Sequence, residues 1–437
     1  MGQARNGTRV GWRPLACALV AGALALAGCG GSDDGGDTAA TGTEETSGGS
    51  VKVGVLQSLS GTMSISEVAV KNASLLAIKE INAAGGVLGR QIEAVVEDGE
   101  SKPEVFAQKI EKLLTTDEVA VVFGGWTSAS RKAMKPVVEG AGGLLFYPVQ
   151  YEGLEVSPNI FYTGATTNQQ IVPALDYMKE QGLTNVYLVG SDYVFPRCAA
   201  AIIRDQAAEL GGIVVDEEYL PLGSHNAADV VRKIVEAEPD MIINTINGDS
   251  NVAFFRALRA AGITPAAIPT MSFSIAEHQL ASLSDQNVIG DYAAWNYFMS
   301  IRGRANSEFV SRFKARYGAH RVVTDPMEAA YFGVHLWAQA VRAAGSDDPA
   351  AIREAAKGQT WQAPQGLVRI DPSTQHVSKT VRIGQIVSGP QFEILYTSDK
   401  PVSPVPYPAT RSRAEWDEFL EDLHLVWGGR WSNPSGR

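Results

Sequence analysis

Cysteine is scarce in this 437-residue chain, which contains only three. Cys17 and Cys29 lie in an N-terminal segment with the features of an export signal, so Cys198 would be alone in the exported domain. A single thiol cannot form an intramolecular disulfide and cannot build a cysteine-ligated metal site. The composition therefore excludes a disulfide-stabilised scaffold and a metal centre made of cysteines.

Signatures of common enzyme classes are also missing. The sequence has no Gly-x-Ser-x-Gly, His-Glu-x-x-His, Walker A or Cys-x-x-Cys motif. A catalytic role for Cys198 is disfavoured because the surrounding helical pattern indicates a buried apolar position. The histidines are dispersed at no metal-ligand spacing, at His225, His278, His320, His335, His376 and His424. We predict a protein that is not an enzyme and that uses no metal or cofactor.

Basic residues are outnumbered, with 37 lysines and arginines against 48 acidic side chains and a net charge of −11. Loss of an N-terminal export segment would remove Arg5, Arg9 and Arg13 and no acid, which makes the charge more negative. A surface of this sign repels phosphate groups, so we predict no nucleic-acid partner.

The longest apolar run, residues 15–27, follows these arginines and is too short to span a membrane. It is typical of a secretory signal peptide, and Leu26-Ala27-Gly28-Cys29 resembles a bacterial lipobox. We therefore interpret residues 1–28 as a lipoprotein signal peptide, with Cys29 lipidated. Residues 29–50 are polar, acidic and of low complexity, which predicts a flexible tether. The expected location is the cell envelope, on the outer face of the cytoplasmic membrane or in the periplasm.

From Val51 onward, short apolar strands alternate with amphipathic helices, a pattern that predicts an α/β fold with mostly parallel sheets. A second series of strands and helices begins near Asn168 and predicts a second doubly wound half. The chain then supplies helices and extended segments that return to each half, which implies a hinge of several crossing strands. We assign residues 51–165 with 298–362 to lobe 1, 166–297 with 363–400 to lobe 2, and 401–437 to a C-terminal tail.

Polar loops follow six of the predicted strands, at residues 57–62, 124–130, 146–153, 190–196, 247–251 and 271–274. Ligands of open α/β sheets bind beyond the carboxyl ends of the strands. The loops carry hydroxyls, amides and aromatic rings with few basic side chains, which favours a small, polar, uncharged ligand. Each polar residue also has a simpler interpretation as a helix cap, which applies to Asp192 and Asp249, and the tyrosines of these loops could be core or rim residues.

The stretch VVFGGWTSASRK, residues 121–132, is the most informative of these loops. Gly124 and Gly125 allow the backbone to turn after a strand, and Ser128 or Ser130 can cap the helix that follows. Trp126 is unusual at such a position, because a large ring at the mouth of a loop needs something flat to cover. We interpret it as one wall of a ligand pocket.

Several segments share their order with a known family and span Val51 to Tyr396. They are LQSLSGTMSISE, INAAGGVLGR, VVFGGWTSASRKA, YPVQYEG, NIFYTGATTNQQ, VGSDYVFPR, INGDSNVAFF, MSFSIAE, YAAWNYF and DPMEAAY. Together they resemble the urea-type substrate-binding proteins of bacterial ABC transporters, which are related to short-chain amide-binding proteins. One departure is Gly125, where many relatives carry cysteine.

The resemblance implies a two-lobed, hinge-closing periplasmic binding protein of type I that passes urea or a short amide to ABC permease subunits. It implies ligand-binding roles in lobe 1 for Trp126, Thr127, Ser128, Tyr147, Val149 and Gln150. In lobe 2 it implies them for Tyr193, Phe195, Asn247, Gly248, Asp249 and Met271.

The chemistry of urea agrees with these roles, because its carbonyl accepts and its four N–H groups donate hydrogen bonds. Gln150, Asn247 and an aspartate can accept, Ser128 or helix N–H groups can donate, and Trp126 supplies the flat wall. Three alternatives remain: a branched-chain amino-acid receptor of the same fold, an amide sensor, and an amidase or urea hydrolase. The export signal disfavours a cytoplasmic sensor, and the lack of metal ligands or an activated nucleophile disfavours a hydrolase.

Overall fold

A computed structural model describes residues 49–283, 286–389 and 391–434 of the chain. The predicted signal peptide, Cys29 and nearly all of the predicted tether lie outside these residues. Within the described ranges, no helix is both long and apolar enough to cross a membrane.

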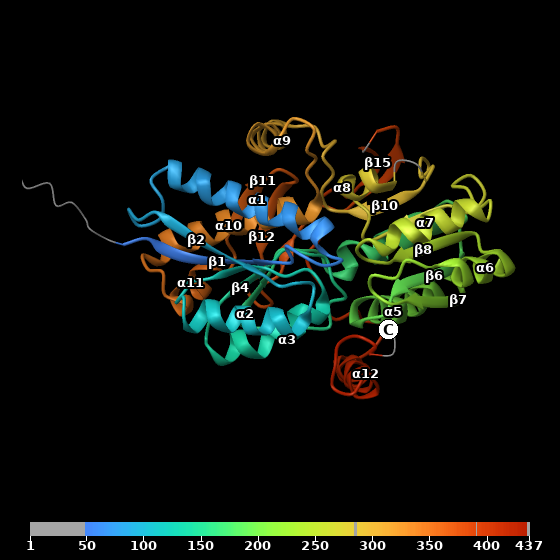
Figure 1. Cartoon of the computed structure of the whole chain (residues 1–437), viewed down its shortest axis with the longest axis horizontal. Helices are drawn as coiled ribbons and strands as arrows, with labels where there is room; N and C mark the ends of the chain where they lie inside the picture. The colour runs from blue at the N-terminus through green and yellow to red at the C-terminus, as the bar shows by residue number, and fades with distance from the viewer. Residues whose placement is uncertain (1–48, 284–285, 390, 435–437) are drawn as a thin grey trace, which may run out of the picture. The chain divides into compact units, whose positions relative to one another are not determined.

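The first sheet is five-stranded and parallel, in the order β2-β1-β3-β4-β5. Its strands are β1 (Val51–Gln57), β2 (Ile92–Asp98), β3 (Val122–Gly124), β4 (Leu145–Tyr147) and β5 (Ile160–Tyr162). The inner strands β3 and β4 are buried and apolar along their length because helices cover both faces. Helices α1 (Ser64–Ala83) and α10 (Asp325–Ala344) pack together on one face, and α2 (Pro103–Thr115) and α3 (Ser128–Gly140) on the other (Figure 1). This is lobe 1.

The second sheet is seven-stranded, in the order β15-β14-β10-β9-β8-β6-β7. Its parallel strands are β6 (Asn185–Ser191), β7 (Ile213–Leu220), β8 (Met241–Thr245), β9 (Thr270–Ser272) and β10 (Tyr292–Trp295). An antiparallel hairpin, β14 (Arg382–Val387) and β15 (Gln391–Thr397), completes the sheet. Its helices are α4 (Ile171–Glu180), α5 (Val194–Leu210), α6 (Ala228–Ala237), α7 (Ser250–Ala260) and α8 (Glu277–Leu280). This is lobe 2, and the predicted two-lobed α/β fold is confirmed.

One boundary of the predicted lobes was wrong. Residues 363–400 were assigned to lobe 2, but β11 (Thr360–Ala363), β12 (Gly366–Ile370) and β13 (Val377–Ser378) form a separate antiparallel sheet. The inward side chains of this small sheet belong to the hydrophobic core of lobe 1, so lobe 2 resumes only at β14. An extended pattern in the sequence predicts a strand, but it does not predict the strand with which it pairs. Helices α9 (Arg304–Tyr317) and α11 (Pro349–Ala356) also belong to lobe 1.

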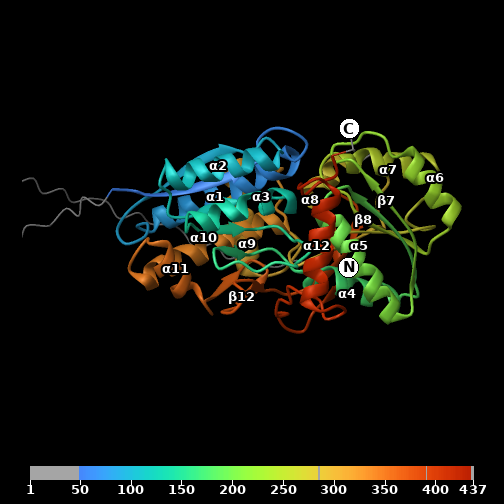
Figure 2. The same cartoon turned by 90° about the horizontal axis from the view of Figure 1, so that it is seen from below.

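The predicted C-terminal tail contains a helix, α12 (Arg413–Val426). Ser412 and Glu415 form a capping box at its start, a signal that is readable in the sequence. Helix α12 packs against α5, as Figure 2 shows. Its Trp416 side chain is fully buried. Arg411 adds a two-pronged ion pair to Asp205 on α5, with distances of 2.7 and 2.8 Å. The segment is thus folded onto lobe 2.

Three crossing segments join the lobes, after β5, after β10 and before β14. The buried amide of Asn296, in the second segment, donates to the carbonyl oxygens of Gln169 in the first (3.0 Å) and Thr380 in the third (3.1 Å). The backbone N–H of Asn296 donates to the Asp325 carboxylate at the start of α10, at 3.0 Å. A single side chain therefore ties all three segments of the hinge.

Candidate functional site

The carboxyl ends of the two sheets meet at Trp126, which follows β3. Its indole Nε1 donates to Oδ1 of Asn247, which follows β8, at 3.2 Å, and only 5% of Trp126 is exposed. Gln150 Nε2 also reaches across, to the carbonyl oxygen of Phe273 at 2.8 Å, and the Thr62 hydroxyl donates to Asp249. The loops that were predicted to converge are therefore in direct contact.

The backbone around Trp126 requires its two glycines. A Cβ at Gly124 would lie 1.9 Å from the carbonyl oxygen of Leu56. Gly125 has φ +83°, and its Cβ would lie 2.8 Å from the Met134 side chain, so a cysteine here would be strained. The Tyr147 hydroxyl donates to the carbonyl oxygen of Trp126. Tyr147 thus positions the tryptophan from beneath.

Neither Ser128 nor Ser130, the two serines predicted to cap α3, is its N-cap. Thr127 is the N-cap, and its hydroxyl accepts from the backbone N–H of Ser130 at 3.0 Å. The hydroxyl of Ser128 donates to Glu152 at 2.5 Å and accepts from Arg131 at 3.0 Å. Ser128 is thus held within a buried charged cluster, and its hydrogen bond to a ligand stays a prediction.

That cluster was missed by the sequence reasoning. The guanidinium of Arg131 is fully buried and contacts Glu152 at 2.9 Å and Glu155 at 3.0 Å, and Lys132 approaches Glu155 at 3.3 Å. The hydroxyl of Tyr162 also donates to Glu155, at 2.9 Å. Two cations and two carboxylates therefore balance one another beneath the Trp126 loop. The signal was present as Arg-Lys on α3 and two glutamates three residues apart after β4.

The protonation states of the cluster follow from this pairing. Burial opposes ionisation of Arg131, but Glu155 and Glu152 raise the pKa of its guanidinium well above its usual range. Burial likewise opposes ionisation of Glu155, but Arg131 and Lys132 hold the pKa of this carboxyl well below its usual range. The cluster is therefore charged on both sides at neutral pH, and it has no cation left over for an anionic ligand.

Three buried side-chain atoms without a partner lie on two segments of lobe 1, the end of β1 and the loop after β4. Both amide atoms of Gln57, the last residue of β1, are buried and unpaired, as is Oε1 of Gln150 in the loop after β4. Val149, the neighbour of Gln150, is buried. Buried polar groups without partners are rare in folded proteins and call for a ligand or water. This part of the site offers a donor and acceptors, all of them uncharged.

The residues predicted in lobe 2 divide into an apolar and a polar group. Tyr193, Phe195 and Met271 are buried in one apolar cluster, and burial raises the pKa of the Tyr193 phenol well above its usual range. Asn247 is held by its backbone N–H, which donates to the Ser191 hydroxyl at 3.0 Å. Gly248 has φ +70°, and a Cβ there would lie 2.9 Å from the Thr62 hydroxyl of lobe 1. Only glycine permits this close approach of the lobes.

The two aspartates proposed as helix caps do not cap. Asp249 makes no capping hydrogen bond and instead accepts from Thr62 of lobe 1. Asp192 pairs with Arg197 at 2.8 Å. Asp249 therefore contributes to the contact between the lobes.

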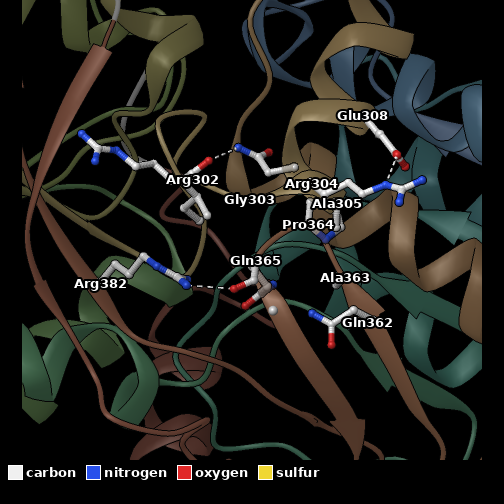
Figure 3. Close-up of a pocket in the computed structure, with 13 residues that line it drawn as sticks. Arg302, Gly303, Arg304, Ala305, Glu308, Gln362, Ala363, Pro364, Gln365 and Arg382 are labelled. Atoms are coloured by element: carbon white, nitrogen blue, oxygen red, sulfur yellow. Dashed lines mark hydrogen bonds and ion pairs between the residues drawn. The ribbon is translucent and has the colours of Figure 1, made fainter.

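Two cavities lie near the contact between the lobes and the hinge. A cavity of about 170 Å³ includes Thr127 and Ala129 of lobe 1 and Asp192 and Tyr193 of lobe 2 in its lining. A larger cavity of about 620 Å³ lies beside the hinge and contains none of the predicted site residues (Figure 3). There Arg304 pairs with Glu308, and Arg382 donates to the carbonyl oxygen of Gln365. The smaller cavity is therefore the one that joins residues of the candidate site.

Glu277, at the start of α8, gives the protein a pH-dependent stability. Burial raises the pKa of its carboxyl to about 8 from the usual 4.5, although it accepts a hydrogen bond from the backbone N–H of Met299. Above pH 4.5 the unfolded chain loses this proton while the folded chain keeps it until about pH 8, so the free energy of unfolding falls across that interval.

We expect Glu277→Gln to flatten this decline, because glutamine remains neutral. The variant should gain up to about 4 kcal/mol over the wild type at pH 8.5 relative to pH 5, measured by guanidinium chloride unfolding. Glu104→Gln, on the exposed first turn of α2, is the matched control. A Glu277→Gln profile parallel to that of the wild type would contradict the prediction.

Comparisons with known proteins agree with this architecture. The pattern of the periplasmic binding protein domain family matches residues 51–413. A Leu/Ile/Val-binding protein homologue of Brucella melitensis is 25% identical over 234 residues, which are 53% of this chain and 60% of that relative. A solute-binding protein of an ABC transporter from Rhodopseudomonas palustris HaA2, solved with p-hydroxybenzoic acid, has a TM-score of 0.73 and 25% identity over 81% of this chain and 98% of its own.

A third protein has the same fold at lower identity. The substrate-binding protein of a branched-chain amino-acid transporter from Streptococcus pneumoniae, solved with isoleucine, has a TM-score of 0.71 at 20% identity. The similarity covers 81% of this chain and 100% of the other. The match to the Brucella relative reaches only 60% of that protein's length, so its name alone does not assign a ligand to this chain.

Proposed function

We propose, from the premise that this chain belongs to the periplasmic binding protein domain family, that it is the substrate-binding protein of an ABC importer. In this proposal the protein captures urea or a short-chain amide between its lobes and delivers it to the permease subunits. Cys29, outside the described residues, would carry the lipid that anchors the protein to the cell envelope.

The observation that carries the ligand class is the set of uncharged, buried and unpaired groups at the carboxyl end of the lobe 1 sheet, where the Trp126 loop also begins. Gln57 offers both amide atoms and Gln150 offers its carbonyl oxygen. The cations in the first turns of α3 and α5 are already paired: Arg131 and Lys132 with glutamates, and Arg197 with Asp192. A neutral ligand with both donors and an acceptor matches this environment better than an anion does.

Each predicted residue takes a role that suits a small planar amide. The carbonyl of the ligand would accept from the amide N–H₂ of Gln57, and its N–H groups would donate to the amide oxygen of Gln150. The indole of Trp126 would cover one face. The other proposed residues shape the site, namely Thr127, Ser128, Tyr147 and Val149 in lobe 1 and Tyr193, Phe195, Asn247, Gly248, Asp249 and Met271 in lobe 2.

Closure of the two lobes around the ligand would couple ligand binding to transport. The contacts between Trp126 and Asn247 and between Gln150 and Phe273 exist only when the lobes meet. A ligand that adds contacts to both lobes shifts the hinge equilibrium toward this closed state. The permease would then recognise the closed arrangement.

The test is isothermal titration of the exported domain, starting near Ser50, with urea, acetamide and leucine. Urea has four heavy atoms, and at about 1.5 kcal/mol per atom its Kd is expected in the tens of micromolar or weaker. Trp126→Ala should weaken binding by at least about tenfold, because it removes the covering ring and the hydrogen bond to Asn247. Trp361→Ala, in β11 of lobe 1, is the matched control and should bind as the wild type does.

A branched-chain amino-acid receptor is the second candidate, and it is favoured by the names of two of the similar proteins. Such a ligand needs donors for its carboxylate, for which the N-terminus of α3 is suited, and an acid for its ammonium group. Saturable binding of leucine with no heat from urea or acetamide would keep the family and overturn the amide assignment.

A further inference from the structure

The C-terminal segment, residues 401–434, begins within the part of the chain that matches the family and continues past it to the candidate site. The family pattern ends at residue 413, and the chain continues through α12 to Trp431. The carbonyl oxygen of Trp431 accepts from the backbone N–H of Val194 at 3.0 Å, and Asn433 N–H donates to the carbonyl oxygen of Asp192 at 3.1 Å. Between them, Ser432 pairs with Tyr193 in an antiparallel bridge. The segment thus lies directly along the lobe 2 wall of the site.

The same segment also touches lobe 1. The ammonium of Lys132 on α3 lies 4.7 Å from the centre of the Trp431 ring, a cation–π contact. Further back along the segment, the carbonyl oxygen of Pro406 accepts from the backbone N–H of Leu154 at 2.7 Å. Gly153 permits this approach, since a Cβ there would lie 2.2 Å from the same oxygen. Gly153 and Leu154 belong to the loop that follows β4, and the same loop contains Gln150.

The segment lines the cavity that contains residues of the candidate site from both lobes. Ser432 and Asn433 line the cavity of about 170 Å³ together with Thr127 of lobe 1 and Tyr193 of lobe 2. Asn433 is also bound through its side chain, which donates to the carboxylate of Asp192 at 2.6 Å. The wall that the segment contributes is therefore held at several points.

We propose that residues 401–434 form a strap that serves as a third wall of the ligand cleft, slows the release of ligand and limits its size. This inference rests on the proposed function, because it assigns regulation to the same site. For the lobes to separate, Lys132 must leave the Trp431 ring, or residues 431–433 must detach from residues 192–194. Either step adds to the barrier for opening but is not needed for the first encounter with ligand, so the effect falls on dissociation.

The test is the rate of ligand release from Trp431→Ala, measured by stopped-flow displacement with urea, acetamide, butyramide and leucine as probes. We expect release about tenfold faster than from the wild type, the loss of one desolvated cation–π contact with its ring packing, with an association rate within about twofold. The variant should also bind butyramide more tightly relative to acetamide than the wild type does. Val426→Ala on α12, where the side chain is 80% exposed, is the matched control.

Hydrogen exchange followed by mass spectrometry separates failure of the strap from failure of the proposed ligand. In the ligand-free protein, Trp431→Ala should accelerate exchange both in residues 190–196 and in residues 124–132 of the opposite lobe. Acceleration confined to residues 190–196, or unchanged release of every probe that the wild type binds, would overturn the strap. If the wild type binds leucine alone, the amide assignment fails, and the release of leucine from the variant still decides the strap.

Discussion

Replacing Arg131 by methionine should lower the free energy of unfolding by about 3–5 kcal/mol, the range measured when one partner of a buried ion pair is removed. The guanidinium is 0% exposed and holds Glu152, Glu155 and the hydroxyl of Ser128. Without it, two carboxylates in the interior of lobe 1 keep only Lys132 as a counter-charge. The loss is large because the charges remain buried.

Guanidinium chloride unfolding at pH 7 measures this effect without adding urea, the proposed ligand. Arg232→Met is the matched control, since Arg232 forms an exposed pair with Glu236 on α6 and its loss should leave the unfolding midpoint unchanged. Arg131→Lys should not rescue the variant, because an ammonium cannot make the several directed contacts of the guanidinium. Wild-type stability in Arg131→Met would mean that the cluster is not coupled to folding.

The triple variant Arg131→Met with Glu152→Gln and Glu155→Gln tests the same reasoning in the opposite direction. Removing the carboxylate charges along with the cation eliminates the uncompensated charges, so the triple variant should be more stable than Arg131→Met alone. It should nevertheless bind ligand poorly, because Ser128 and Tyr147 pack on the cluster beneath Trp126. The triple variant would thus regain stability without regaining ligand binding.

Much of the fold was predictable because apolar strands and amphipathic helices have different periodicities. The alternation predicted from Val51 onward is found in both lobes, where α1 (Ser64–Ala83) follows β1 and α7 (Ser250–Ala260) follows β8. Strand β5 (Ile160–Tyr162) was not among the predicted strands. The hairpin β12–β13 was placed in the wrong lobe because pairing is decided by contacts distant in sequence.

The candidate site was predictable at the level of loops but not of atoms. The rule for parallel sheets places Trp126 and Asn247 at the carboxyl ends of their two sheets, and the packing of the lobes brings them into hydrogen-bond contact. Ser128 was expected to be available to a ligand because its partners Glu152 and Arg131 do not stand out in the sequence. Local sequence shows which polar groups exist, whereas tertiary structure decides which of them are already paired.

Asn296→Ala should affect both stability and ligand affinity, because this side chain bonds all three crossing segments of the hinge. Its removal leaves the buried carbonyl oxygens of Gln169 and Thr380 without these donors, at a cost of about 2–4 kcal/mol in the free energy of unfolding. A hinge with fewer fixed contacts has more freedom to lose on closure, so the Kd for ligand should rise by about three- to tenfold.

Asn306→Ala separates the two effects. Asn306 is also a buried amide that donates to two carbonyl oxygens, those of Met299 and Ile301, at 3.0 and 2.7 Å. Its partners lie in the second crossing segment alone, so its loss should cost similar stability and leave the Kd unchanged. Denaturation gives the free energy of unfolding of each variant, and titration gives its Kd for ligand. Equal losses of affinity in the two would mean that Asn296 acts only through global stability, whereas a loss confined to Asn296→Ala would identify its amide as the element that couples the crossing segments to closure.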